Sequence, residues 1–94
     1  MAKKKGLIQV KNYKGPLPKG VVDGVIKGFE GKKADIYILG GGTGMTKGAE
    51  KSWGNFKKDV NKKGSSAEYF TKEQANKILY NLINNLFNNN KNTN

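Results

Sequence analysis

The sequence predicts an α+β fold, a small antiparallel sheet of two or three strands within residues 7–39 packed on two helices at 47–62 and 72–88. Three observations indicate it. Residues 7–13 alternate apolar and polar side chains, which is the period of a strand. The second observation is an apolar stripe at helical spacing, formed by Ala49, Trp53, Phe56 and Val60. The third is a capping-box pattern directly before another amphipathic run.

The chain begins with a basic segment, residues 1–6, which we expect to be a flexible arm. We expect residues 7–88 to form a single domain, and 89–94 to be a disordered polar tail. The first strand ends before Gly15-Pro16-Leu17-Pro18, because paired glycine and proline residues break regular structure.

Residues 17–29 fit two structures. Apolar residues recur there at helical spacing, at Leu17, Val21, Val22, Val25, Ile26 and Phe29. Against a helix, the segment contains Gly20, Gly24 and Gly28, each about 1 kcal/mol worse than alanine in a helix. We favour a hairpin with its tip at 30–33 and its return strand at 34–39. If 17–29 is helical instead, the chain opens like a winged-helix domain that lacks its wing.

The second half of the chain has clearer signals. Residues 40–44 form a loop by composition, and the 47–62 helix follows. Thr71 and Gln74 form the capping box of the last helix. Its apolar face consists of Ala75, Ile78, Leu79, Leu82, Ile83 and Leu86. This face is wide for so small a domain, and it predicts a homodimer.

The charge of the chain predicts its class of partner. Eighteen of the 94 residues are lysine, none is arginine, and seven are acidic, which gives a formal net charge of +11. Such a chain repels itself unless a polyanion is its partner, and nucleic acid is the commonest one. Without arginine, the chain lacks the bidentate fork that usually reads guanine. It is therefore expected to bind phosphates strongly and to read bases through other side chains.

The strongest candidate site is the outer face of the 47–62 helix. At about 100° per residue, five residues fall opposite its apolar stripe: Lys47, Lys51, Asn55, Lys58 and Lys62. An ordinary solvated face mixes charges of both signs. Asn55 supplies the paired donor and acceptor that match adenine. The alternative is a lysine-rich exposed face in a lysine-rich protein.

Two further basic regions are candidates for nucleic-acid contact. The tip of the expected hairpin carries Lys32 and Lys33, with Lys27 nearby, and would suit a narrow A/T-rich minor groove. The arm carries Lys3, Lys4 and Lys5, and basic arms commonly follow phosphates. Both regions are also consistent with solubility alone.

Other functions have little support in the sequence. Cysteine and histidine are both absent, so we expect no metal site, no other cofactor and no enzymatic activity. The glycine-rich segment 40–47 lacks the Gly-Lys-Ser/Thr ending of a phosphate-binding loop. A loop, or a helix N-terminus that takes one DNA phosphate, is the better interpretation. No apolar run is long enough to cross a bilayer, and we expect a cytoplasmic protein without a membrane partner.

These observations predict a small, non-enzymatic protein that binds duplex DNA through the lysine and asparagine face of the 47–62 helix, with A/T-rich sites as a possible preference. Its size and composition are typical of accessory factors of plasmids and phages. Two alternatives stay open. One is a binder of RNA or single-stranded DNA, and the other is an inhibitor or adaptor that binds an acidic surface on a partner protein.

Overall fold

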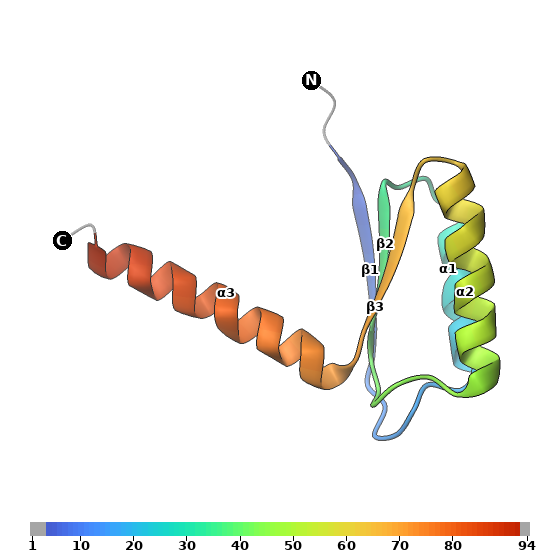
Figure 1. The fold of residues 1–94 in the computed structure, drawn as a ribbon, viewed down its shortest axis with the longest axis horizontal. Helices are drawn as coiled ribbons and strands as arrows, with labels where there is room; N and C mark the ends of the chain where they lie inside the picture. The colour runs from blue at the N-terminus through green and yellow to red at the C-terminus, as the bar shows by residue number, and fades with distance from the viewer. Residues whose placement is uncertain (1–3, 93–94) are drawn as a thin grey trace.

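Strands and helices alternate along the chain in the computed structural model, which describes residues 4–92. The elements are β1 (Gly6–Lys11), α1 (Lys19–Glu30), β2 (Ile36–Gly41), α2 (Lys47–Lys62), β3 (Ser66–Phe70) and α3 (Lys72–Asn92). Helices α1 and α2 lie on one side of the sheet, and α3 extends away from the other side (Figure 1). The α+β expectation is therefore confirmed in its general form.

The three strands are parallel and lie in the order β1-β2-β3. Ile8 of β1 lies opposite Ile38 of β2, which lies opposite Glu68 of β3. The expected antiparallel sheet within residues 7–39 is therefore wrong, because each pair of strands is joined by a crossover helix and not by a hairpin. One strand, β3, comes from a segment in which we expected none.

Helix α1 occupies most of the segment for which we favoured a hairpin, so the helical alternative is confirmed for residues 19–29. Its buried residues are Val22, Val25 and Phe29. A Cβ atom added at Gly20, Gly24 or Gly28 would meet nothing within 4 Å. These glycines thus cost helix propensity only, and core burial outweighs that cost. The winged-helix arrangement is not formed, because all three strands pair in parallel.

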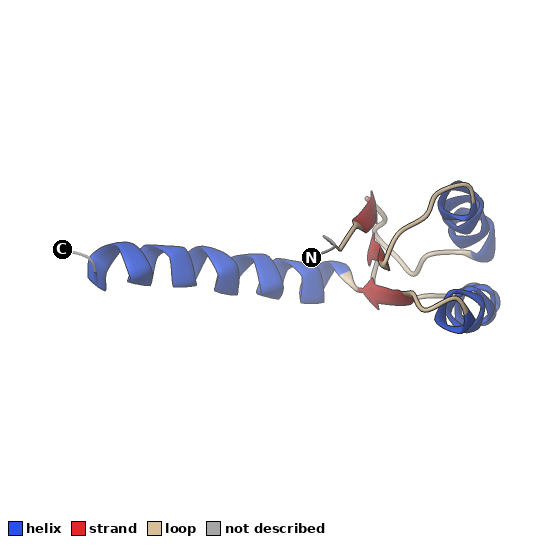
Figure 2. Cartoon of the chain, turned by 90° about the horizontal axis from the view of Figure 1, so that it is seen from above, coloured by secondary structure: helices blue, strands red, loops and turns tan. Residues whose placement is uncertain are grey.

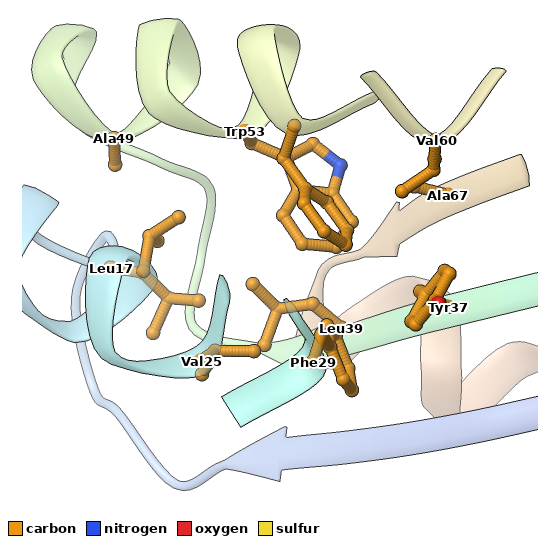
Figure 3. Packing of buried hydrophobic residues seen from close by; sticks show 11 residues of the cluster. Leu17, Val25, Phe29, Tyr37, Leu39, Ala49, Trp53, Val60 and Ala67 are labelled. Atoms are coloured by element: carbon orange, nitrogen blue, oxygen red, sulfur yellow. The ribbon is translucent and has the colours of Figure 1, made fainter. Parts of the chain in front are cut away.

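The core lies between the sheet and the layer of α1 and α2. Its largest side chains come from three elements and meet around Phe29 (Figure 3). The ring centroid of Phe29 is 5.2 Å from that of Tyr37, 5.9 Å from Phe56 and 6.5 Å from Trp53. The predicted helix at 47–62 is confirmed at both ends, and its predicted apolar stripe is buried.

We expected the last helix to pack on the sheet, but α3 does not. It contacts β2 and β3, and its first residue, Lys72, donates a hydrogen bond to the Gly42 carbonyl; the helix then projects outward (Figure 2). The Cα radius of gyration is 15.6 Å, whereas a compact chain of this length has about 12 Å. The helix runs to Asn92, so residues 89–92 of the expected polar tail are helical. No helix among residues 4–92 has the length and apolar character needed to span a membrane.

Candidate functional site

The outer surface of α2 carries the residues we call the lysine stripe, which are Lys47, Lys51, Asn55, Lys58 and Lys62. All five side chains are exposed. The opposite face of the helix is anchored in the core by Trp53 and Phe56, which are 5% and 4% exposed. The start of the helix is set by Thr46, whose hydroxyl accepts a hydrogen bond from the Ala49 N–H over 3.3 Å. The core therefore determines which way the stripe faces.

No carboxylate of the described side chains forms an ion pair with the lysine stripe. The one ion pair among the side chains of residues 4–87 joins Lys19 Nζ to Asp23 Oδ2 at 2.6 Å, on α1. Along the stripe, Lys47 and Lys51 stand four residues apart, as do Lys58 and Lys62. Like charges at this spacing destabilise a helix by a few tenths of a kcal/mol per pair. A polyanion lying along α2 would remove that cost.

The hairpin that was expected to present Lys32 and Lys33 does not exist. Both residues lie in the connection between α1 and β2, and Lys27 lies in the last turn of α1. All three are exposed. Because each crossover helix returns along the sheet, the last residues of α1 and α2 reach the same edge, where the strands begin (Figure 1). The tight hairpin tip proposed for a minor groove is therefore replaced by a broad basic edge.

Cavities at this amino edge bring together lysines from separate parts of the chain. A cavity of about 450 Å³ between the ends of α1 and α2 is lined in part by Lys32, Lys33 and Lys63. A neighbouring cavity of about 360 Å³ shares Lys33 and Lys63 and adds Lys5. We call Lys5, Lys32, Lys33 and Lys63 the amino-edge cluster. Lys63 directly follows Lys62, the last residue of the lysine stripe.

Three carboxylates also line these cavities, from Glu30, Asp35 and Asp59. Asp35 links the segment before β2 to the segment before β1, because its Oδ2 accepts a hydrogen bond from the Lys5 backbone N–H over 2.7 Å. The amino-edge cluster is thus less uniformly positive than the lysine stripe. The lysine stripe contains no carboxylate and is the more uniformly positive of the two surfaces.

The arm is partly outside the described residues. Lys3 lies outside them, whereas Lys4 and Lys5 are described and exposed. The Lys5 carbonyl accepts a hydrogen bond from the Asp35 N–H over 2.8 Å, so the chain is held against β2 from this residue onward. Sequence reasoning assigned Lys5 to the arm and missed Lys63. The signal for Lys63 is its position after α2, but its place in the same cavities as Lys33 follows only from the parallel strand order.

The glycine-rich loop lies between β2 and α2, at the carboxyl edge of the sheet where ligands bind in many parallel folds. Two of its backbone N–H groups donate hydrogen bonds within the chain itself. The Thr43 N–H donates to the Gly15 carbonyl at 3.1 Å, and the Thr46 N–H donates to the Leu17 carbonyl at 3.1 Å. A phosphate cradle needs such N–H groups free. We therefore interpret the loop as a packing element.

Two described groups have shifted pKa values, and local structure explains both. The hydrogen bond from Lys19 lowers the pKa of the exposed Asp23 carboxyl. Burial raises the pKa of the Tyr69 hydroxyl, although its hydrogen bond with the Gly44 backbone acts in the opposite direction. Asp23 lies on α1 and Tyr69 on β3. Neither shift indicates a pair of groups arranged for proton transfer.

Comparison with protein-family models, curated proteins and solved structures found no match to this chain.

Proposed function

We propose that this protein binds duplex DNA without catalysing a reaction, and that the lysine stripe on α2 is its main contact. One observation carries the proposal. A helix held rigidly by its buried face presents four lysines and one asparagine on its exposed face, with no carboxylate paired to any of them in the described structure. Lysine ammonium groups neutralise phosphates as point charges.

The dimensions of α2 suit a duplex. Its 16 residues give a length of about 24 Å, and an α-helix with side chains is about 10–12 Å wide, close to the ~12 Å width of the major groove. Helix α1 lies beside α2 in the same layer (Figure 2). This neighbour limits how deeply α2 can enter a groove, so phosphate contacts should contribute most of the affinity. The amino-edge cluster would extend those contacts along the backbone.

Single-stranded nucleic acid fits the surface less well. Binding of single strands relies on exposed aromatic rings on which bases stack. Tyr37 is 7% exposed and belongs to the core, and the Tyr69 hydroxyl is bonded to backbone carbonyls. Tyr13 is exposed, and the other exposed aromatic rings of the described residues, Tyr80 and Phe87, lie on α3, which extends from the side of the sheet opposite α2. These positions favour the duplex over RNA or single-stranded DNA.

Salt-dependent binding tests the proposal. The double variant Lys51→Ala/Lys58→Ala removes two stripe lysines, and a matched control, Lys72→Ala/Lys77→Ala, removes two exposed lysines of α3. Duplex affinity is measured by fluorescence anisotropy over a range of salt concentrations. The stripe variant should bind more weakly and lose up to roughly 1.8 from the slope of log K against log salt, because each phosphate contact contributes about 0.9.

The control should change the affinity much less. Equal effects of the two double variants would show that net charge, and not the lysine stripe, governs binding. Absence of duplex binding at low salt would refute the proposal altogether. Binding by an acidic protein but not by duplex would favour the adaptor function instead.

A further inference from the structure

The sheet has one face covered by helices and one face open. Because side chains alternate along a strand, the residues flanking buried Tyr37 and Leu39 point to the open face. That face is built from Ile8, Val10, Ile36, Ile38, Glu68 and Phe70, according to the strand register. Ile8 and Val10 are 65% and 71% exposed. Parallel sheets are normally covered on both faces, so this face lacks a helix layer.

Helix α3 has the converse feature, an apolar face that covers nothing. Its exposed large residues are Ile78, Leu79, Tyr80, Leu82, Ile83, Leu86 and Phe87. Leu82, at the centre of this face, is 57% exposed. Residues 78–87 contain no charged side chain. A protein with a net charge of +11 therefore carries one uncharged apolar segment that projects from its body (Figure 1).

The chain cannot readily close α3 over its own sheet. A single residue, Thr71, separates β3 from α3. Thr71 and Gln74 also exchange two hydrogen bonds, Thr71 N–H to Gln74 Oε1 at 2.9 Å and Gln74 N–H to Thr71 Oγ1 at 3.1 Å. The Lys72 N–H donates to the Gly42 carbonyl at 2.8 Å. Reversing α3 would break the hydrogen bond from Lys72 to Gly42, and strand-to-helix reversals normally use two to six connecting residues.

We propose that two copies of this chain form a reciprocal dimer, in which α3 of each copy covers the open sheet face of the other. The two surfaces agree in length. The apolar face of α3 from Ala75 to Phe87 extends about 18 Å at 1.5 Å per residue. A six-residue strand extends about 17–20 Å. In a dimer with twofold symmetry, the same contact occurs twice, so that the open sheet face and the apolar face of α3 are covered in both chains.

The exposed apolar area is comparable with that of a standard interface. Nine large apolar side chains on β1 and α3 are exposed by 43% to 71%. Taking roughly 170 Å² for a large side chain, they offer on the order of 900 Å² per chain, compared with about 800 Å² per partner in a standard interface. Charge also permits the contact, because Glu68 is the one charged residue on the open face and the apolar face of α3 adds none. Interface centres are typically depleted of charge.

A second copy of the chain accounts for the two uncovered apolar surfaces better than a different protein does. The sheet needs a helix with an apolar face, and α3 needs a flat apolar surface of similar length. Each chain supplies what the other lacks, whereas a foreign partner would have to supply both. The proposal does not depend on DNA binding, and it is tested without DNA.

The first test is the mass of the full chain in solution, measured by sedimentation equilibrium at micromolar concentration. The wild-type chain should be a dimer. Leu82→Asp should shift it to the monomer by placing a charge at the centre of the apolar face. Asn84→Asp adds the same charge on the opposite face of α3 and should leave the dimer intact. A monomeric wild-type chain, or equal dissociation by both variants, would overturn the proposal.

The second test asks which surfaces meet, and it exploits the absence of cysteine from the chain. Ile38→Cys places a thiol at the centre of the open face, and Leu82→Cys places one at the centre of α3. An oxidised mixture of the two single variants should give a cross-linked dimer containing one of each. A mixture of Ile38→Cys with Asn84→Cys is the control and should cross-link poorly.

Two outcomes would overturn the reciprocal arrangement. In one, Leu82→Cys cross-links efficiently to itself but not to Ile38→Cys, which would mean that α3 pairs with α3. In the other, the double variant Ile38→Cys/Leu82→Cys forms an internal disulfide as a monomer, which would mean that α3 folds back on its own sheet. Circular dichroism of each variant establishes that it is folded before cross-linking is measured.

Discussion

The Tyr69 hydroxyl of β3 donates a hydrogen bond to the Gly41 carbonyl over 2.6 Å, and it also lies 3.0 Å from the Gly44 carbonyl. One side chain thereby ties the third strand to both ends of the glycine-rich loop. That loop leads directly into α2, whose first residue is Lys47. The loop that precedes the lysine stripe is thus held by a contact between segments 25 to 28 residues apart.

We predict that Tyr69→Phe lowers the free energy of unfolding by about 1–2 kcal/mol. The variant removes the hydroxyl donor and leaves loop carbonyls without their partner, while the ring still packs. Urea denaturation measures the change. Tyr13→Phe, at an exposed tyrosine, is the control and should change stability by less than about 0.5 kcal/mol. An equal effect of both substitutions would contradict the structural role of the Tyr69 hydroxyl.

Alkaline pH should weaken the same contact. Burial raises the pKa of Tyr69 in the folded protein, so the folded state holds this proton more tightly than the unfolded state. The stabilisation is therefore complete below pH ~10, the ordinary pKa of tyrosine, and is lost as pH rises through the folded-state pKa. The difference in urea midpoint between wild type and Tyr69→Phe should therefore shrink as the pH rises above about 10. A difference independent of pH up to 11 would contradict the shift.

Two Gly→Ala variants should have opposite effects. Gly41 has φ +121°, and a Cβ atom there would lie 1.9 Å from the Lys11 carbonyl oxygen. Gly41→Ala should therefore destabilise the fold by roughly 3 kcal/mol or more. At Gly24 a Cβ atom meets nothing within 4 Å, so Gly24→Ala should stabilise α1 by about 0.5–1 kcal/mol. Thermal unfolding distinguishes them, and a stable Gly41→Ala would refute the loop geometry.

Asn55 should differ from its lysine neighbours in its effect on specificity. Its amide is able to donate to and accept from adenine, whereas lysines on phosphates carry no sequence information. Asn55→Ala should lose roughly 1–3 kcal/mol on a site selected from a random pool and little on a scrambled duplex. Lys58→Ala should weaken both about equally. Competition titration against the two duplexes measures these affinities. If Asn55→Ala lost the same affinity on both duplexes, Asn55 would contact the DNA phosphate backbone and not a base.

Helix α2 was predictable because its signal is local. Four apolar residues at steps of four, three and four determine which side is buried, and the lysine stripe follows from the same helical period. The capping box of α3 was predictable for the same reason, since Thr71 and Gln74 interact within one turn. Where a structural feature depends on a few residues close together in the chain, the sequence was enough to predict it.

The direction of the strands could not be predicted from local sequence patterns. Residues 19–30 contain three glycines that oppose a helix by propensity, but Val22, Val25 and Phe29 gain more by entering a core shared with α2. Once α1 forms, it returns the chain along the sheet and makes β1 and β2 parallel.

The sequence by itself therefore determined the charge, the helix that carries the lysine stripe and the apolar face of α3, because each depends on residues within a few turns of one another. Tertiary structure alone decided that the strands are parallel, that Lys63 and Lys33 line the same cavity, and that α3 leaves an open sheet face uncovered. These features depend on which distant segments bury surface together, and that competition is settled by packing across the whole chain.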